Sequence, residues 1–372
     1  EEIIKDLEGA KWTVENVERK ALSRNPLPPF TTSTLQQDAF RHLGFSTKQT
    51  MFIAQQLYEG VDVGEGSVGL ITYMRTDSVN LAEDSLKDAR ELIKKDLGEN
   101  YILPTPRRFQ TKTKGAQEAH EAIRPADPAK TPESIERFLD KKQFKLYNLI
   151  WKRFIATQMP AAIFDATSVD IAATTSYQPP ATSYTFRATG QIMKFDGFLK
   201  VYTIKFSEVT LPQMAPKEEI ELKELKPLQH FTQPPPRFSE ATLVKILEQN
   251  GIGRPSTYSP IISTIQGRGY VEKYERRYLK PTETGFLVND ILVEHFPEIV
   301  DVKFTAKMEE ELDEIAEGKM AWQPVIKEFY EPFAKHLEEK YKIVEKHKVM
   351  ETTEEICEKC GKPMVIRLGR FG

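Results

Sequence analysis

The order of apolar and polar residues divides the chain into helical and β-rich segments. Residues 31–155 follow mainly the helical period, with capping-box spacings at the expected helix starts and glycines at the expected ends. Between the second and third of these helices, the apolar run Val68–Met74 predicts one buried strand. The expected starts are Ser33 with Gln36, Ser46 with Gln49 and Asn80 with Glu83, and the expected ends are Gly44, Gly60 and Gly98.

Residues 161–225 alternate between apolar and polar positions or are rich in β-branched residues, which predicts strands. The segment Lys11–Lys20 is also strand-like, but it has no neighbour with which to pair, and a lone strand is not stable in water. We therefore pair it with the later sheet, so that residues 31–155 form a helical insertion in a β domain. The predicted strands are residues 164–171, 184–188, 198–206 and 220–225.

Residues 237–345 return to the helical pattern. Ser239 is placed to cap a helix that ends at Asn250–Gly251, and Gly253–Thr257 predicts a tight turn into a second helix. Three tyrosine-led segments in residues 270–281 then predict a small basic β ribbon. Helix, turn, helix and ribbon is the order of a winged-helix-like nucleic-acid module. An ordinary helical hairpin followed by a ribbon fits the same pattern equally well.

Length and charge add to this picture. The chain has 372 residues, which predicts two or three domains, and its 52 basic and 55 acidic side chains give a net charge of −3. Basic residues gather in residues 105–124 and 252–280, which are candidate contacts for a polyanion, although a solvated surface is the simpler interpretation of either one. Residues 281–356 are acidic, and Glu309–Glu314 within them are expected to form a solvated helix surface.

Several classes of protein are excluded. No apolar run is long enough to cross a membrane, and no signal peptide begins the chain. Two cysteines cannot form a disulfide framework, which favours a reducing, cytoplasmic compartment. Neither a P-loop nor a Gly-x-Gly-x-x-Gly motif is present, so we expect no ATP site. Both ends, Glu1 and Gly372, look cut, and we expect a piece of a longer protein.

Tyr73 is the candidate nucleophile, at the expected junction of a strand and a helix. Such a junction offers backbone donors to an anion, and Arg75 could hold a phosphate through two parallel hydrogen bonds. A phenol has a reference pKa of about 10, so it needs a cation or a base beside it. The alternative is a core tyrosine next to a surface pair of Arg75 and Asp77.

Two further motifs carry candidate ligands. Residues 117–124 predict a short helix on which His120 and Arg124 share a face; Arg124 replaces the second histidine of a zinc-protease motif, so a phosphate or a base is the candidate ligand. The alternative is a lone surface histidine beside an intrahelical Glu–Arg pair. Cys357 and Cys360 have the spacing of a zinc knuckle, but they supply only half of a four-ligand site.

Four motifs in order resemble the bacterial DNA topoisomerase I family, of type IA. The resemblance implies a partial toroid of multi-domain α+β class around a hole that admits DNA. In it, residues 31–155 would carry the nucleophile, residues 1–30 with 156–232 the β-rich arch and hinge, residues 233–345 the helical, winged-helix-like DNA-binding base, and residues 346–372 the start of a truncated zinc-ribbon region. The motifs are Phe-Thr-Thr-Ser-Thr-Leu-Gln-Gln (30–37), Ile-Thr-Tyr-Met-Arg-Thr-Asp-Ser (71–78), Gln-Glu-Ala-His-Glu-Ala-Ile-Arg-Pro (117–125) and Gly-Ile-Gly-Arg-Pro-Ser-Thr-Tyr (251–258).

The resemblance also implies roles. Tyr73 would attack a phosphodiester and keep the 5′-phosphate, Arg75 would hold that phosphate, and His120 with Arg124 would bind a nucleotide. The partners would be single-stranded and negatively supercoiled DNA, bound by a cytoplasmic, nucleoid-associated monomer. Mg²⁺ would be held by the family's TOPRIM domain and Zn²⁺ by its C-terminal tail, with no use of ATP. The residues that would line the path of the strand are Arg254, Ser256, Thr257 and Arg268.

This chain departs from the family pattern because it lacks the TOPRIM domain, so we expect it not to relax DNA alone. One alternative function is a non-enzymatic clamp for single-stranded DNA, which the intact Tyr73-Met-Arg75 motif disfavours. Another is the topoisomerase III or reverse gyrase branch, although a C-x₂-C pair after the base fits bacterial topoisomerase I better.

Overall fold

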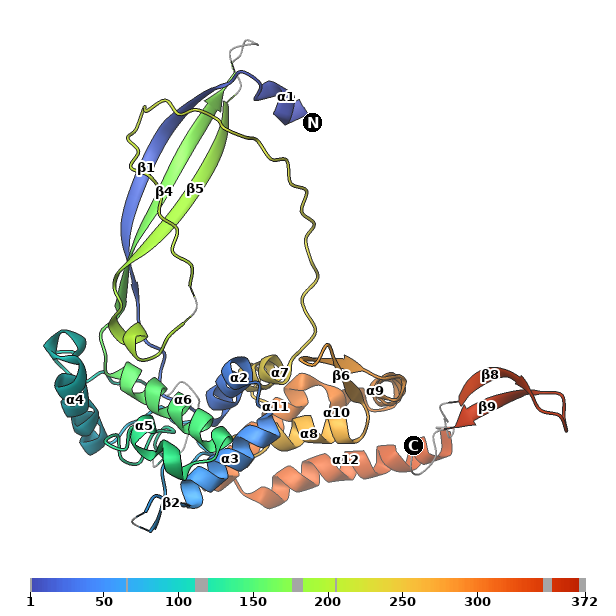
Figure 1. Ribbon diagram of the computed structural model, residues 1–372. Coiled ribbons are helices and arrows are strands. Elements are labelled where there is room, and N and C mark those ends of the chain that lie inside the picture. Colours follow the sequence, from blue (N-terminus) through green and yellow to red (C-terminus); the bar gives the residue numbers. More distant parts are fainter. Residues whose placement is uncertain are drawn as a thin grey trace.

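A three-stranded antiparallel sheet stands over a body of helices in the computed structural model, which describes residues 2–64, 66–110, 120–175, 183–204, 206–343 and 350–367 (Figure 1). Its order is β1 (Lys11–Arg24), β4 (Ala162–Thr174) and β5 (Ser183–Phe195). Strand β1 pairs with β4 from Lys11–Thr174 to Arg24–Ala162, so the predicted partner of the N-terminal segment is confirmed. The chain between these neighbouring strands forms the helical body.

Two predicted strands are wrong. Residues 198–206, of which 205 lies outside the described residues, begin with the 3₁₀ helix η3 (Gly197–Lys200), and Phe198 and Tyr202 are buried in the helical core instead of in the sheet. Residues 220–225 form no strand; only the Ile220 N–H donates to the Trp12 carbonyl, at 3.0 Å. Alternation did not suffice here because Leu222 stays exposed, without an apolar face to cover.

The helical body has one large core. It continues into the foot of the sheet, where Phe164 packs with the same buried cluster as Leu35 and Phe154. Its elements are α2 (Thr32–Leu43), α3 (Thr47–Glu59), β2 (Val61–Asp62), β3 (Ser67–Val68), α4 (Glu83–Leu97), η1 (Glu99–Tyr101), α5 (Pro132–Ile135), η2 (Glu136–Phe138) and α6 (Lys141–Thr157), preceded at the N-terminus by α1 (Glu2–Asp6).

The helix boundaries in this body follow the sequence signals in part. Ser46 caps α3 as predicted, and Gly44, Gly60 and Gly98 end α2, α3 and α4. Two predicted starts are wrong, since α2 is capped by Thr31 instead of Ser33, and α4 begins after Ala82, which makes no side-chain cap. Thr31 is the cap because its Oγ1 accepts from the Thr34 N–H at 3.2 Å, whereas Ser33 is turned to another helix.

The strand predicted at residues 68–74 is also wrong, since β3 ends at Val68. Leu70, Ile71 and Met74 are buried, as an apolar run should be. Their backbone, however, bonds to three different segments instead of one strand. The Leu70 N–H donates to Leu57 O at 2.7 Å, Ile71 makes a single bridge to Pro125, and Met74 O accepts from the Thr32 hydroxyl at 2.7 Å. The sequence thus predicted the burial of these side chains, but it did not predict the hydrogen-bond partners of their backbone.

Residues 239–343 form the base of the molecule. The predicted order of helix, turn, helix and ribbon is present, and Ser239 caps the first helix. Val244, Tyr258 and Ile262 make a small core of their own. The elements are α7 (Glu240–Gln249), α8 (Tyr258–Gly267), β6 (Val271–Tyr274), β7 (Tyr278–Pro281), α9 (Glu283–His295), α10 (Pro297–Val300), α11 (Val302–Ala316) and α12 (Trp322–Ile343), followed by the hairpin β8 (Met350–Ile356) and β9 (Pro363–Arg367).

An extended segment, residues 207–237, joins the sheet to the base; we call it the strap (Figure 1). It first follows the sheet, where the Lys217 N–H donates to Val14 O at 2.7 Å. Beyond Ile220, no backbone hydrogen bond holds its described residues until Phe238 meets the ribbon. None of the described helices is both long and apolar enough to span a bilayer.

Candidate active site

Tyr73 lies on an irregular segment that the first turn of α2 fixes in place. The Thr32 hydroxyl donates to Met74 O at 2.7 Å and accepts from the Thr76 N–H at 2.9 Å. Because Met74 and Thr76 point into the protein, the alternate residues Tyr73 and Arg75 are turned outward, and Tyr73 is 39% exposed. The predicted strand-to-helix junction is wrong, since α4 begins only at Glu83.

The Tyr73 ring sits between two other rings. Its centroid lies 5.4 Å from that of Tyr58 and 6.0 Å from that of His120, both in edge-on contact. The structure therefore brings Tyr73 and His120 together, and the alternative of a core tyrosine is wrong. Arg75 is exposed, and within the described part of the chain it makes neither an ion pair nor a hydrogen bond. The alternative surface pair with Asp77 does not form.

His120 and Arg124 do not share a helix face. Residues 120–124 run beside the Tyr73 segment without helical structure, and residues 117–119 lie outside the described residues. The Thr72 hydroxyl donates to Ala122 O at 2.7 Å and accepts from the Arg124 N–H at 3.0 Å, and these bonds to another segment replace those of a helix.

The Arg124 side chain is only 11% exposed and is already engaged by the protein. Its Nη2 donates to Glu121 Oε2 at 2.6 Å, and its Nη1 donates to Pro125 O at 2.9 Å. The guanidinium thus fastens the loop that presents His120. Its predicted contact with a nucleotide stays a prediction.

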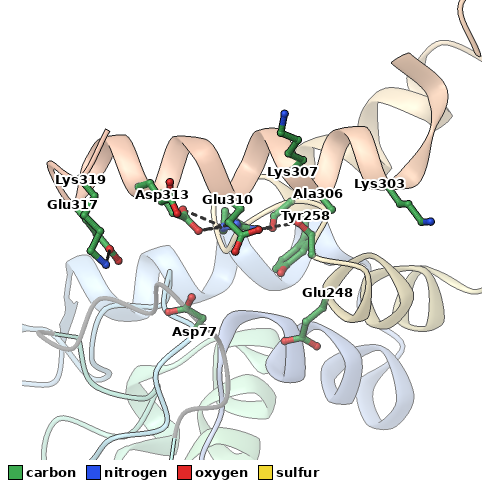
Figure 2. Close-up of a pocket in the computed structure, with 14 residues that line it drawn as sticks. Asp77, Glu248, Tyr258, Lys303, Ala306, Lys307, Glu310, Asp313, Glu317 and Lys319 are labelled. Atoms are coloured by element: carbon green, nitrogen blue, oxygen red, sulfur yellow. Dashed lines mark hydrogen bonds and ion pairs between the residues drawn. The ribbon is translucent and has the colours of Figure 1, made fainter. Parts of the chain in front are cut away.

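A cavity of about 880 Å³ lies between the segment that follows Tyr73 and the base (Figure 2). Asp77 and Glu248 are on one side of it, and α11 is on the other. Arg254 lines the cavity, but its Nη2 donates to Asp313 Oδ2 at 2.7 Å, and its Nη1 lies 3.9 Å from Glu309 Oε2. The expectation that these acidic residues of α11 form only a solvated surface is therefore wrong.

Burial controls the charge of the cavity. It raises the pKa of Asp77, and the Asp77 backbone N–H and the Arg254 charge offset only part of this increase. Burial also raises the pKa of Glu248, which accepts from the Ser33 hydroxyl at 2.7 Å and is repelled by Asp77. Both carboxyl groups therefore hold a proton more readily than exposed ones do.

The predicted residues of the strand path fall into two places. Arg254, Ser256 and Thr257 belong to one turn, in which Thr257 Oγ1 accepts from the Arg254 N–H at 2.7 Å and Ser256 is exposed. Arg268 is exposed at the opposite end of α8. The structure thus groups three of these residues in one turn, of which Arg254 lines the cavity, and leaves the fourth at the other end of α8.

Comparison with known proteins decides the family. A family model described as DNA topoisomerase matches residues 1–327. The chain belongs to this family. It is also similar to the full-length topoisomerase I of Thermotoga maritima, with 37% sequence identity and a TM-score of 0.80. The match covers 100% of this chain and 59% of that chain, so this topoisomerase chain spans less than two thirds of that relative.

The resemblance to bacterial type IA topoisomerases is thus confirmed, together with a mixed α/β fold that matches theirs. The domain boundaries and the roles of single residues stay predictions.

Magnesium and zinc are the metals expected for this family. In the described part of the chain, no three His, Cys, Asp or Glu side chains are grouped to hold a metal ion, so the residues do not fit a magnesium site. Cys357 and Cys360 form a knuckle in which the Gly361 N–H donates to Cys357 O at 2.9 Å. Backbone N–H groups of Lys359 and Cys360 lower the pKa of Cys357, which suits half of a zinc site. Zinc stays a prediction.

Sequence reasoning missed Tyr58 and Glu248, which lie at the candidate site beside Tyr73 and in the cavity wall. Tyr58 lies in the last turn of α3, and its ring reaches Tyr73 because the chain turns back through β2 and β3. Glu248 sits in the last turn of α7 and looks like an ordinary solvated residue in the sequence. Neither residue carries a local signal, since each acts on a segment that is distant along the chain.

Proposed function

We propose that this chain supplies the nucleophile of a DNA topoisomerase that cuts and rejoins one strand of DNA. The observation that carries the proposal is the exposed Tyr73 ring, held against His120 with Arg75 unpaired beside it. The phenolic oxygen attacks a phosphodiester, forms a 5′-phosphotyrosine and releases a 3′-hydroxyl. Attack by that hydroxyl reverses the step, and supercoil strain drives the net relaxation of negatively supercoiled DNA.

The chemistry assigns a task to each neighbour. A phenol is a weak nucleophile near neutral pH, so charge on the phosphate must be held while the oxygen attacks. Arg75 is free to hold two phosphate oxygens through parallel hydrogen bonds. His120 lies against the ring and orients the nucleotide or the phenol. One phosphodiester replaces another, so the exchange itself needs no ATP, and we derive no step through a metal.

The test is Tyr73→Phe, which removes one hydroxyl and leaves the ring contacts in place. Both the full natural protein and residues 1–372 alone are incubated with magnesium and a labelled single strand, and covalent adducts are resolved on a denaturing gel. We expect the full protein to form an adduct, its Tyr73→Phe variant to form none, and binding of the strand to persist. The chain alone is expected to form no adduct and to relax no DNA.

Tyr58→Phe is the matched control, because it removes a hydroxyl from the neighbouring ring of the same cluster. An adduct in the Tyr73→Phe variant, or its loss only in Tyr58→Phe, would show that the nucleophile is assigned wrongly. If the full protein binds single strands but never forms an adduct, the non-enzymatic clamp replaces this proposal.

A further inference from the structure

A second basic and aromatic surface lies where the strap enters the base. A cavity of about 440 Å³ opens there between α2, the end of the strap and the β6–β7 ribbon. Among the described residues that line it, none is acidic. We call it the ribbon surface, and the residues that define it are Phe40, Arg41, Arg237, Phe238, Arg277 and Tyr278.

Backbone contacts fix this surface. The Leu279 N–H donates to Phe238 O at 2.7 Å, and Ser239 makes an antiparallel bridge with Tyr278, so the strap is added as a short edge to the ribbon. In the turn that follows β6, Glu275 and Arg276 have positive φ values of 48° and 62°. Backbone hydrogen bonds at Phe238 and Ser239, just after the strap, therefore fix its end relative to the ribbon.

Two of the three arginines of the ribbon surface have no partner among the described residues. Arg237 and Arg277 are exposed and, over the residues that the structure describes, neither makes an ion pair or a hydrogen bond through its side chain. The third arginine, Arg41, forms an ion pair with Asp38, with 3.2 Å between Nη1 and Oδ1. Arg124 and Arg254 of the candidate active site, in contrast, are bound by carboxylates. Two unpaired guanidinium groups beside a cavity without acidic residues attract a polyanion.

Aromatic rings lie among these charges. Phe238 is 50% exposed although it is held in the ribbon by its backbone, and Tyr274 on β6 is also exposed. Every base has a face on which an aromatic ring can stack, and arginines that track phosphates supply the remaining affinity in proteins that bind single strands. A protein partner would also contact these rings, but the two arginines beside a cavity without acidic lining residues favour a polyanion such as a DNA strand.

We propose that the ribbon surface binds a single DNA strand, with bases stacked on Phe238 and phosphates held by Arg237 and Arg277. It shares no residue with the cavity at Asp77, so it is a second contact for DNA. Helices α2 and α7 and β6 lie on the side of the base that faces the open space between the sheet and the strap (Figure 1). The DNA strand would therefore lie on that side of the base. The proposal rests on the proposed function only in taking DNA as the ligand.

The test is the double variant Arg237→Gln/Arg277→Gln of this chain, titrated against a fluorescein-labelled oligothymidylate and followed by anisotropy at several salt concentrations. Removal of two phosphate contacts is expected to weaken binding at least tenfold and to reduce the slope of log Kd against log salt by about 1.4. Phe238→Ala is expected to weaken binding roughly tenfold with an unchanged slope, because stacking releases no counterion.

Two controls match these changes. Lys87→Gln/Lys95→Gln removes two exposed charges from α4, and Phe52→Ala removes an exposed ring from α3; neither touches the ribbon surface. Unchanged affinity and slope in the arginine variant, or an equal loss in the lysine control, would overturn the proposal. Adduct formation by the Tyr73→Phe variant would refute the proposed function but leave this result intact, so the two failures are distinguishable.

Discussion

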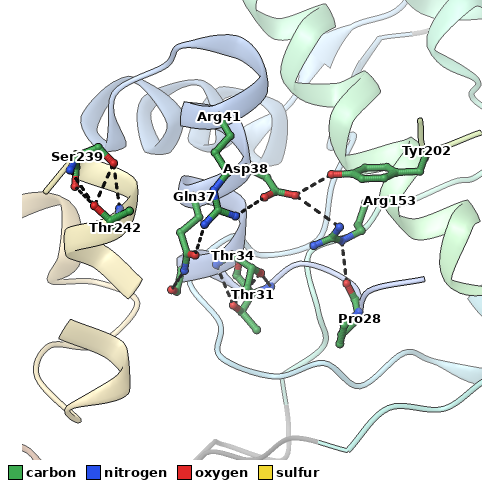
Figure 3. A network of polar contacts seen from close by, with 11 residues as sticks. Pro28, Thr31, Thr34, Gln37, Asp38, Arg41, Arg153, Tyr202, Ser239 and Thr242 are labelled. Atoms are coloured by element: carbon green, nitrogen blue, oxygen red, sulfur yellow. Dashed lines mark hydrogen bonds and ion pairs between the residues drawn. The ribbon is translucent and has the colours of Figure 1, made fainter. Parts of the chain in front are cut away.

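The helical body meets its neighbours at two junctions that are built differently. At the sheet junction, Arg153 of α6 and Asp38 of α2 are buried, with side chains 5% and 9% exposed and an ion-pair distance of 3.5 Å (Figure 3). The Tyr202 hydroxyl donates to Asp38 at 2.7 Å, and Arg153 Nε donates to Pro28 O at 2.9 Å. The Arg153 guanidinium also stacks 4.5 Å from the centre of the Phe30 ring.

The base junction depends on single polar contacts between helices. Glu240 of α7 accepts from the backbone N–H and the hydroxyl of Thr47, at 2.8 and 3.1 Å, and so adds an acceptor at the start of α3 to the Ser46 cap. Ser33 of α2 donates to Glu248, as described above. The core of the base is separate from the core of the helical body, whereas the core at the sheet junction is continuous.

The difference between a continuous core and two separate cores indicates which parts of the molecule separate more easily. At the sheet junction, separation would expose a continuous apolar core and leave a buried charge without its partner, which is costly. At the base junction, Ser33, Thr47 and Glu240 are buried as well, but separation there divides no continuous apolar core, and water can hydrogen-bond to the polar groups that it uncovers. We therefore expect the helical body to move with the sheet and to part first from the base.

The largest effect should come from Arg153→Leu, because it removes the buried cation from Asp38 and leaves only the half-exposed Arg41 beside that carboxylate. We expect a loss of about 3–5 kcal/mol in the free energy of unfolding, measured in urea. Arg41→Gln is the control: Arg41 pairs with the same Asp38, but its side chain is half exposed, so its loss should cost less than about 1 kcal/mol. Equal losses in the two variants would show that burial does not set the strength of this junction.

A smaller effect is expected from Glu240→Ala at the base junction. The variant removes the acceptor of the Thr47 N–H and hydroxyl but keeps the Ser46 cap, which should cost about 1–2 kcal/mol. Amide hydrogen exchange should speed up at the start of α3 and in α7, with β4 unchanged. Glu240→Gln keeps an acceptor for Thr47 and should restore most of the protection. Faster exchange in the sheet would mean that the two junctions are coupled and that the contrast between them fails.

The smallest effect concerns pH. Because burial raises the pKa of Glu248, the folded state binds more protons than the unfolded state between the ordinary value of 4.5 and the raised one. Stability from this group is present below that window and is lost as pH rises through it. Glu248→Gln, which can still accept from Ser33, should flatten this part of a stability profile measured by urea unfolding. An unaltered slope would assign the pH dependence to Asp77 instead.

Local signals predicted much of the fold. Ser46 and Ser239 cap their helices because a cap depends on residues only a few positions away, and the basic ribbon forms from adjacent segments. The candidate site also contains Tyr73 and His120 in contact, although the two residues belong to separate motifs and the sequence predicted no contact between them.

The errors share one physical cause, which is a partner from far along the chain. The segments at Ile71 and Ala122 are fixed by hydrogen bonds to other parts of the body, so neither became the predicted strand or helix. The sequence pattern predicts a solvated Asp313, but in the structure Asp313 accepts a hydrogen bond from Arg254, which is distant along the chain. The sequence pattern of a single segment contains no information about which distant segment will supply its hydrogen-bond partners.

The strap has a mechanical consequence. Residues 221–237 leave the sheet with no backbone bonds of their own, and Pro234, Pro235 and Pro236 stiffen their end. A segment of this length reaches at most roughly 55–60 Å when fully stretched. Figure 1 shows it as an extended segment between the sheet and the base. Because hydrogen bonds hold it to β1 at Ile220 and to the ribbon at Phe238, its length sets the greatest distance to which these two points can separate.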